Sequence, residues 1–219
     1  MPPSEPGSRR RSTIKHERFA LSSTAPESSR RTSSFGHSWG GAIVQRFAFE
    51  HRNEVAGLVL VDSSEADVID RLLALLPRCS VVRCGPIANV RAGLHKTLEP
   101  SSNPEAVEWR ASIPQLHQLK SLGSIPLVVL TAGTSDIGVG LPPPYAGRTY
   151  EIWLRAQSQL AALLSQSVHA VAEHSGHLIP VYQPEAVVAA VKAVVRAACS
   201  GRLPACHAVF RGVTGVRCM

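Results

Sequence analysis

The sequence predicts one α/β domain in which helices cover a parallel sheet, and two observations lead to this fold class. Buried parallel strands are short and almost continuously apolar. Three such runs occur, at residues 57–62, 125–131 and 168–173. Helical patterns lie at residues 42–49 and 184–198. Strands that alternate with helices are typical of a parallel sheet with helices on its faces.

A glycine-serine frame, G-x-S-x-G, directly precedes the first of these helices. It consists of Gly36, His37, Ser38, Trp39 and Gly40. Small residues are needed where the backbone turns sharply from a strand into a helix, and the turn lifts the central hydroxyl clear of the chain. The frame therefore predicts that Ser38 is an exposed nucleophile.

The residues that could activate Ser38 follow later in the chain. A neutral serine hydroxyl is a poor nucleophile, so a histidine must remove its proton and a carboxylate must orient that histidine. Asp136 follows the strand at residues 125–131, and His177 follows the strand at residues 168–173. The order is nucleophile, acid, base, each just past a predicted strand end.

This order and spacing resemble the α/β-hydrolase superfamily. The elbow GHSWGG, the strand LVLVDSS and the loop SGHLI are similar to those of serine-nucleophile hydrolases of the alpha/beta hydrolase fold-1 group. The resemblance covers residues 35–198. It implies hydrolysis of an ester or similar acyl bond in a small-molecule substrate, with no cofactor and no metal. Ser38 would attack, His177 would carry the proton, and the Trp39 N–H would help to hold the oxyanion.

Two aspartates compete for the role of the acid. Asp136 fits the turn Gly133-x-x-Asp136, which is common after this strand in the family, and we prefer it. Asp62, at the end of the preceding strand, is the alternative acid, because some relatives take their carboxylate from that position.

The sequence also departs from the family pattern before the elbow. Residues 29–35 are basic and polar, where a buried strand should be apolar. Neither the loop that donates a second oxyanion N–H nor the first half of the usual sheet has a counterpart. The expected fold is thus a partial α/β-hydrolase fold that lacks the N-terminal half of the sheet. The alternative function is a catalytically weak or silent truncated protein that binds a partner chain, or self-associates, through its open sheet edge.

Composition and periodicity, together with the resemblance, divide the chain into three parts. Residues 1–34 are rich in Ser, Arg and Pro and are predicted to be disordered. Residues 35–198 form the domain, with a helical cap inserted at about residues 63–124. Residues 199–219 show little periodicity and are predicted to be an irregular tail. The basic N-terminal segment fits either an organellar transit peptide or a truncated or mis-spliced gene model.

Charge and cysteine content exclude other classes. The net charge of +7 arises largely from arginines that flank the expected domain, so dedicated nucleic-acid binding is not expected. No run is long and apolar enough to span a membrane. The five cysteines form no C-x-x-C pair. Their odd number and the lack of a secretory signal predict free thiols in a reducing compartment such as the cytoplasm, with organellar import as the alternative.

Overall fold

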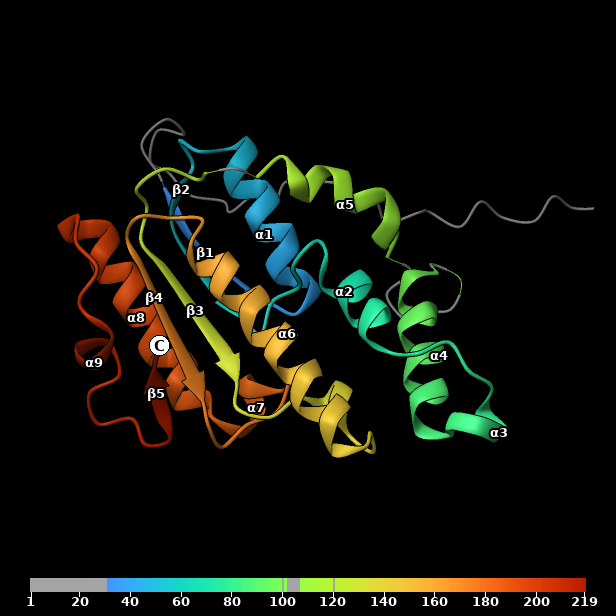
Figure 1. Cartoon of the computed structure of the whole chain (residues 1–219). Coiled ribbons are helices and arrows are strands. Elements are labelled where there is room, and N and C mark those ends of the chain that lie inside the picture. Colours follow the sequence, from blue (N-terminus) through green and yellow to red (C-terminus); the bar gives the residue numbers. More distant parts are fainter. Residues whose placement is uncertain (1–30, 100, 102–106, 120) are drawn as a thin grey trace, which may run out of the picture.

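A computed structural model describes residues 31–99, 101, 107–119 and 121–219. It contains one five-stranded sheet in the order β1-β2-β3-β4-β5 (Figure 1). The strands are β1 (Thr32–His37), β2 (Val55–Val61), β3 (Leu127–Ala132), β4 (Ser167–Ala172) and β5 (Val216–Cys218). The first four are parallel, and β5 pairs with β4 in the antiparallel sense.

The apolar runs in the sequence form the centre of this sheet, which confirms the predicted α/β class. All six residues of β3 are buried, as are six of the seven in β2. Alternate residues of these strands face opposite sides. Val59, Val61 and Val128 belong to one core cluster, and Leu58 and Leu60 belong to another. Each face therefore requires its own helical cover.

Three long helices provide this cover (Figure 1). Helix α8 (Pro184–Ser200) lies over β2 and β3 on one face, where Ala190 and Val194 complete the first cluster. Helices α1 (Trp39–Glu50) and α6 (Pro143–Ala161) cover the other face. The sheet is thus enclosed on both sides, as parallel sheets generally are.

In the described residues between β2 and β3, where the cap was expected, there are four further helices. They are α2 (Val68–Leu75), α3 (Val81–Cys84), α4 (Pro86–Leu98) and α5 (Trp109–His117). Their apolar side chains form a third core cluster together with residues of α1 and α6. The cap is therefore packed onto the domain.

Strand β1 shows how a polar sequence can still form a strand. Thr32, Ser33 and Ser34 are expected to be disordered, yet they are the first half of β1 and pair in parallel with β2. Within the described sheet β1 is an edge strand, and of its six residues only Gly36 is buried, so it does not need an apolar sequence. The rest of the predicted disordered segment, residues 1–30, lies outside the described residues.

The C-terminal tail is not irregular, contrary to the prediction. Helix α8 extends to Ser200, and it is followed by the short helix α9 (Cys206–Val209) and by β5. Strand β5 has only three residues, too few to show a periodicity. It forms because the edge of β4 offers backbone hydrogen-bonding groups, which a sequence pattern cannot reveal.

The prediction of free thiols is wrong for four of the five cysteines. Cys79 is disulfide-bonded to Cys84, and Cys206 to Cys218, which leaves Cys199 as the free thiol. The second pair joins α9 to β5, so its partners meet only in the folded chain. In the part of the chain that the structure describes, no helix is both long and apolar enough to cross a membrane.

Candidate active site

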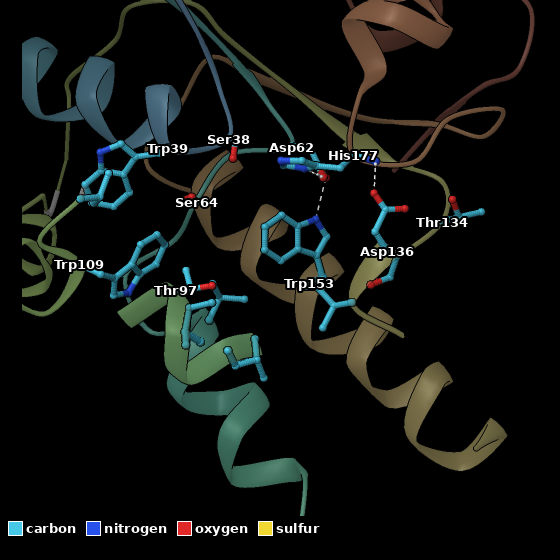
Figure 2. A pocket seen from close by; sticks show the side chains of 16 residues that line it. Ser38, Trp39, Asp62, Ser64, Thr97, Trp109, Thr134, Asp136, Trp153 and His177 are labelled. Carbon is cyan, nitrogen blue, oxygen red and sulfur yellow. Dashed lines mark hydrogen bonds and ion pairs between the residues drawn. The ribbon is translucent and has the colours of Figure 1, made fainter. Parts of the chain in front are cut away.

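The four residues proposed from the sequence as nucleophile, acids and base follow four neighbouring parallel strands. Ser38 follows β1, Asp62 follows β2, Asp136 lies in a short 3-10 helix after β3, and His177 lies in the loop after β4. The carboxyl ends of parallel strands meet at one edge of a sheet. The topology therefore brings all four residues to the same place (Figure 2).

The backbone is strained at two of these positions. Ser38 has φ 54° and ψ −125°, and Asp62 has φ 40°; they are the only residues other than glycine with positive φ among those the structure describes. A non-glycine residue in such a conformation costs about 1–3 kcal/mol and persists only where its surroundings fix it. Both strained residues lie in the candidate site, where the positive φ sets the direction of each side chain.

The glycines of the elbow are needed to different degrees. A Cβ atom on Gly36 would lie 2.5 Å from the carbonyl oxygen of Gly40, and one on Gly41 would overlap Ser63. A Cβ atom on Gly40 would meet nothing within 4 Å. Of the two glycines in the G-x-S-x-G frame, only Gly36 is therefore required by packing, and Gly41 is required just outside the frame.

The imidazole of His177 is held by Asp62. Nδ1 of His177 lies 2.7 Å from Oδ2 of Asp62, whose side chain is 3% exposed. The other carboxylate oxygen accepts the Ala132 N–H at 3.0 Å and the Trp153 indole N–H at 2.7 Å. A buried carboxylate is costly unless it is fully hydrogen-bonded. These contacts supply that compensation, so the carboxylate is fixed against the ring.

Asp136, the acid preferred from the sequence, does not lie against the imidazole ring of His177. It is exposed, and its Oδ2 accepts the backbone N–H of His177 at 3.3 Å, with no hydrogen bond to the ring. Its carboxylate can approach this loop because Gly176 has no side chain; a Cβ atom there would lie 2.7 Å from Oδ1 of Asp136. The geometry favours Asp62 as the partner of the imidazole and reverses the ranking made from the sequence.

His37 links the turn at Ser38 to the loop that carries His177. Its Nε2–H donates to the carbonyl oxygen of His177 at 2.8 Å, and the two rings lie 4.6 Å apart. The residue before the nucleophile thus fixes the loop that carries the candidate base.

Helix α6 supports the site with two residues that the sequence reasoning missed. Trp153 donates to Asp62, and Gln157 bonds both backbone groups of Ser63, accepting its N–H at 3.2 Å and donating to its C=O at 2.7 Å. Gln157 is fully buried. It shares an apolar helical stripe with Trp153 and Leu160, and a polar residue on such a stripe is the signal that could have revealed it.

The backbone N–H of Trp39 is the candidate oxyanion donor from the sequence analysis. Trp39 is the first residue of α1, so its N–H has no acceptor within the helix. The carbonyl oxygen of Ser38 accepts the N–H groups of Gly41 and Ser64, which fixes the peptide that carries the Trp39 N–H. In the described residues no strand precedes β1, and a second backbone donor stays unassigned.

A cavity of about 420 Å³ opens beside these residues. Ser38 and His177 line it, and the wall beyond them is mostly apolar and comes from α1, the cap and α6 (Figure 2). One wall residue, Trp109, is 5% exposed, and its indole N–H has no hydrogen-bond partner within the described structure. An unsatisfied buried donor costs about 1–3 kcal/mol. The remaining lining residues are Trp39, Asp62, Ser64, Val68, Ile69, Leu94, Thr97, Val107, Thr134, Ser135, Asp136, Ile137 and Trp153.

Comparison with known protein families identifies the family of the chain. A model of the alpha/beta hydrolase family matches residues 21–190. The chain belongs to the alpha/beta hydrolase family. No curated protein matches it.

Several solved hydrolase structures are similar to the chain. An esterase from Thermogutta terrifontis is 24% identical over 77% of this chain and 66% of that one, with a TM-score of 0.43. A hydrolase from Pseudomonas aeruginosa is 18% identical over 76% and 65%, with a TM-score of 0.42. The 2-hydroxy-6-oxo-6-phenylhexa-2,4-dienoate hydrolase of Rhodococcus sp. strain RHA1 is 14% identical over 76% and 64%, with a TM-score of 0.44. The chain thus spans slightly less than two thirds of the length of these proteins.

The elbow geometry makes a prediction about stability. Gly36→Ala should lower the free energy of unfolding by roughly 1–3 kcal/mol, because the new methyl group overlaps the backbone of the next turn. Gly40→Ala has open space and lies in a helix, so its effect should stay within about 1 kcal/mol. Urea denaturation of both variants measures the difference. Equal losses would show that the turn does not have this packing.

The hydrogen bond from Trp153 to Asp62 gives a second prediction. Trp153→Phe removes a donor from a buried carboxylate and should cost about 1.5–3 kcal/mol of stability, the range for bonds to charged groups. Tyr150→Phe is the matched control on the same helix, since the Tyr150 hydroxyl donates to the uncharged carbonyl oxygen of Ala132 at 3.2 Å. Denaturant titration should show a smaller loss for Tyr150→Phe. A reversed order would mean that Asp62 is stabilised by other groups.

Proposed function

We propose that this chain is a serine hydrolase that cleaves esters or similar acyl bonds through Ser38, His177 and Asp62. The observation that carries the proposal is the buried Asp62 carboxylate on Nδ1 of His177, next to a strained serine that lines the same cavity. A carboxylate in this position holds the proton on Nδ1, so that Nε2 is the nitrogen that accepts a proton from a nucleophile.

The reaction would proceed in two steps. His177 takes the proton of the Ser38 hydroxyl as its oxygen attacks the ester carbonyl carbon, and the Trp39 N–H donates to the resulting oxyanion. When the intermediate collapses, the bond to the leaving oxygen breaks and His177 returns the proton to that oxygen. Water then attacks the acyl-serine in the same way and releases the acid and free Ser38. Asp62 stays ionised and stabilises the imidazolium throughout.

Asp136 has another role in this proposal. Its bond to the backbone N–H of His177 helps to position the loop that carries the base. Asp136 is exposed and makes no described hydrogen bond to the imidazole ring, which supports the assignment of the orienting role to Asp62.

A catalytically silent protein that binds another chain is the second candidate. Strand β1 pairs on only one side in the described sheet, and Phe35 on it is 44% exposed. Unpaired strand edges readily add a further strand. A second copy of this chain could do so, and sedimentation would then show a dimer.

Covalent labelling tests the proposed nucleophile. A serine-reactive alkyl phosphonate should label the wild-type protein, and Ser38→Ala should abolish labelling, because the phosphorus forms a bond with the activated oxygen. Ser64→Ala is the matched control, since Ser64 lines the same cavity. Intact-mass spectrometry reports the adduct. A labelled Ser38→Ala protein would refute the assignment.

The two aspartates provide the second test. Asp62→Asn should lower the turnover of p-nitrophenyl acetate by about 10³–10⁴-fold, because an amide stabilises the wrong imidazole tautomer and cannot balance the imidazolium charge. Asp136→Asn should lower it less than about tenfold, since the side-chain oxygen of Asn can still accept the backbone N–H of His177. Steady-state kinetics with both folded variants decides between them. The opposite ranking would return the acid to Asp136.

A further inference from the structure

The cavity has a charge distribution opposite to that of the whole chain. Its described lining contains two carboxylates, Asp62 and Asp136, and no lysine or arginine, whereas the chain carries a net charge of +7. Asp62 is buried, and its two carboxylate oxygens already form hydrogen bonds with the His177 ring and the Trp153 indole. Asp136 is therefore the carboxylate that is left for a bound molecule.

Asp136 has capacity for a ligand. No lysine, arginine or histidine side chain of the described structure forms an ion pair with its carboxylate, and the one hydrogen bond of that carboxylate to a described residue is the 3.3 Å contact with the backbone N–H of His177. A carboxylate can accept several hydrogen bonds and carries a full negative charge. It therefore disfavours an anionic group in its neighbourhood and favours a cation.

The proposed reaction specifies which part of a substrate would lie beside Asp136. His177 must return its proton to the leaving oxygen, so the leaving group lies on the side of His177. Asp136 contacts the backbone of the same residue. In Figure 2, Asp136 and Thr134 lie on one side of His177, and Trp39, Trp109 and Thr97 lie on the opposite side, beyond Ser38. The leaving alcohol would thus enter the acidic part of the cavity.

The apolar part of the cavity contains a buried polar group that a ligand could satisfy. Among the described residues nothing accepts the buried indole N–H of Trp109, whose ring lies 4.8 Å from that of Trp39. Trp39 and Trp109 share one apolar core cluster with the lining residues Val68, Ile69 and Leu94, and the acyl group would occupy this apolar part. The cavity is therefore polarised, with an apolar acyl side and an acidic leaving-group side.

We propose that the substrate is an ester whose alcohol carries a positive charge, such as an ammonium alcohol, and that Asp136 is the residue that selects it. This inference rests on the proposed hydrolase function and specifies its substrate class. The aromatic face of Trp153, which also lines the cavity, would add a favourable contact with such a cation.

Two esters of the same shape test the proposal. Acetylcholine and 3,3-dimethylbutyl acetate differ in one atom, a charged nitrogen in place of a neutral carbon. The wild-type kcat/KM should favour the cationic ester by about fivefold, the upper range for an exposed charge pair. Asp136→Asn should bring the ratio close to one. Glu151→Gln removes the same charge from an exposed residue of α6 outside the cavity lining and should keep the wild-type ratio.

A binding measurement separates this proposal from the hydrolase function. Choline and 3,3-dimethylbutanol are titrated calorimetrically into Ser38→Ala, with and without Asp136→Asn, so that no turnover is needed. Tighter binding of choline that depends on Asp136 supports the charge selection even if the wild-type protein hydrolyses neither ester, which would count against the hydrolase proposal alone. Equal binding of the two alcohols, or a choline preference that survives Asp136→Asn, overturns the inference.

Discussion

The candidate site depends on one buried carboxylate. Asp62 is nearly inaccessible to water, and its two oxygens are occupied by the His177 ring, the Ala132 N–H and the Trp153 indole. An ion in such a place is tolerated only when each neighbour presents a hydrogen-bond donor. This requirement couples the end of β3, helix α6 and the histidine loop to a single side chain.

The sheet order makes this coupling possible. Strands β1 and β2 are neighbours in register, with His37 opposite Val61, so Ser38 and Asp62 emerge side by side from the sheet. Positive φ values at both residues turn their side chains out of the strand directions. Gln157 then fixes Ser63 from α6, which holds the strained backbone after β2. The strain is stored where several independent contacts determine the geometry.

The cap completes the site from the other side. Its helices share one apolar cluster with Trp39 and Trp153, so the walls of the cavity and the core of the cap are the same packing unit. Trp153 belongs to this cluster and also donates to Asp62, so the packing of the cap is linked to the position of the carboxylate.

The sequence by itself determined what depends on local patterns. Apolar runs predicted β2, β3 and β4, because a strand buried on both faces must be apolar. The glycine-serine frame predicted the sharp turn at Ser38, where Gly36 leaves no room for a side chain. His177 was proposed as the base because it follows the predicted strand at residues 168–173.

The tertiary structure decided what depends on neighbours in space. Asp62 and Asp136 both follow strands, and only the folded chain shows which carboxylate reaches the imidazole, because that depends on the strained backbone of Asp62 and on the order of the strands. The bond from Trp153 joins residues 91 positions apart. The pairing of Cys206 with Cys218 and the strand β5 likewise need the open edge of β4. None of these contacts leaves a periodic signal, since each is made by a single pair of distant groups.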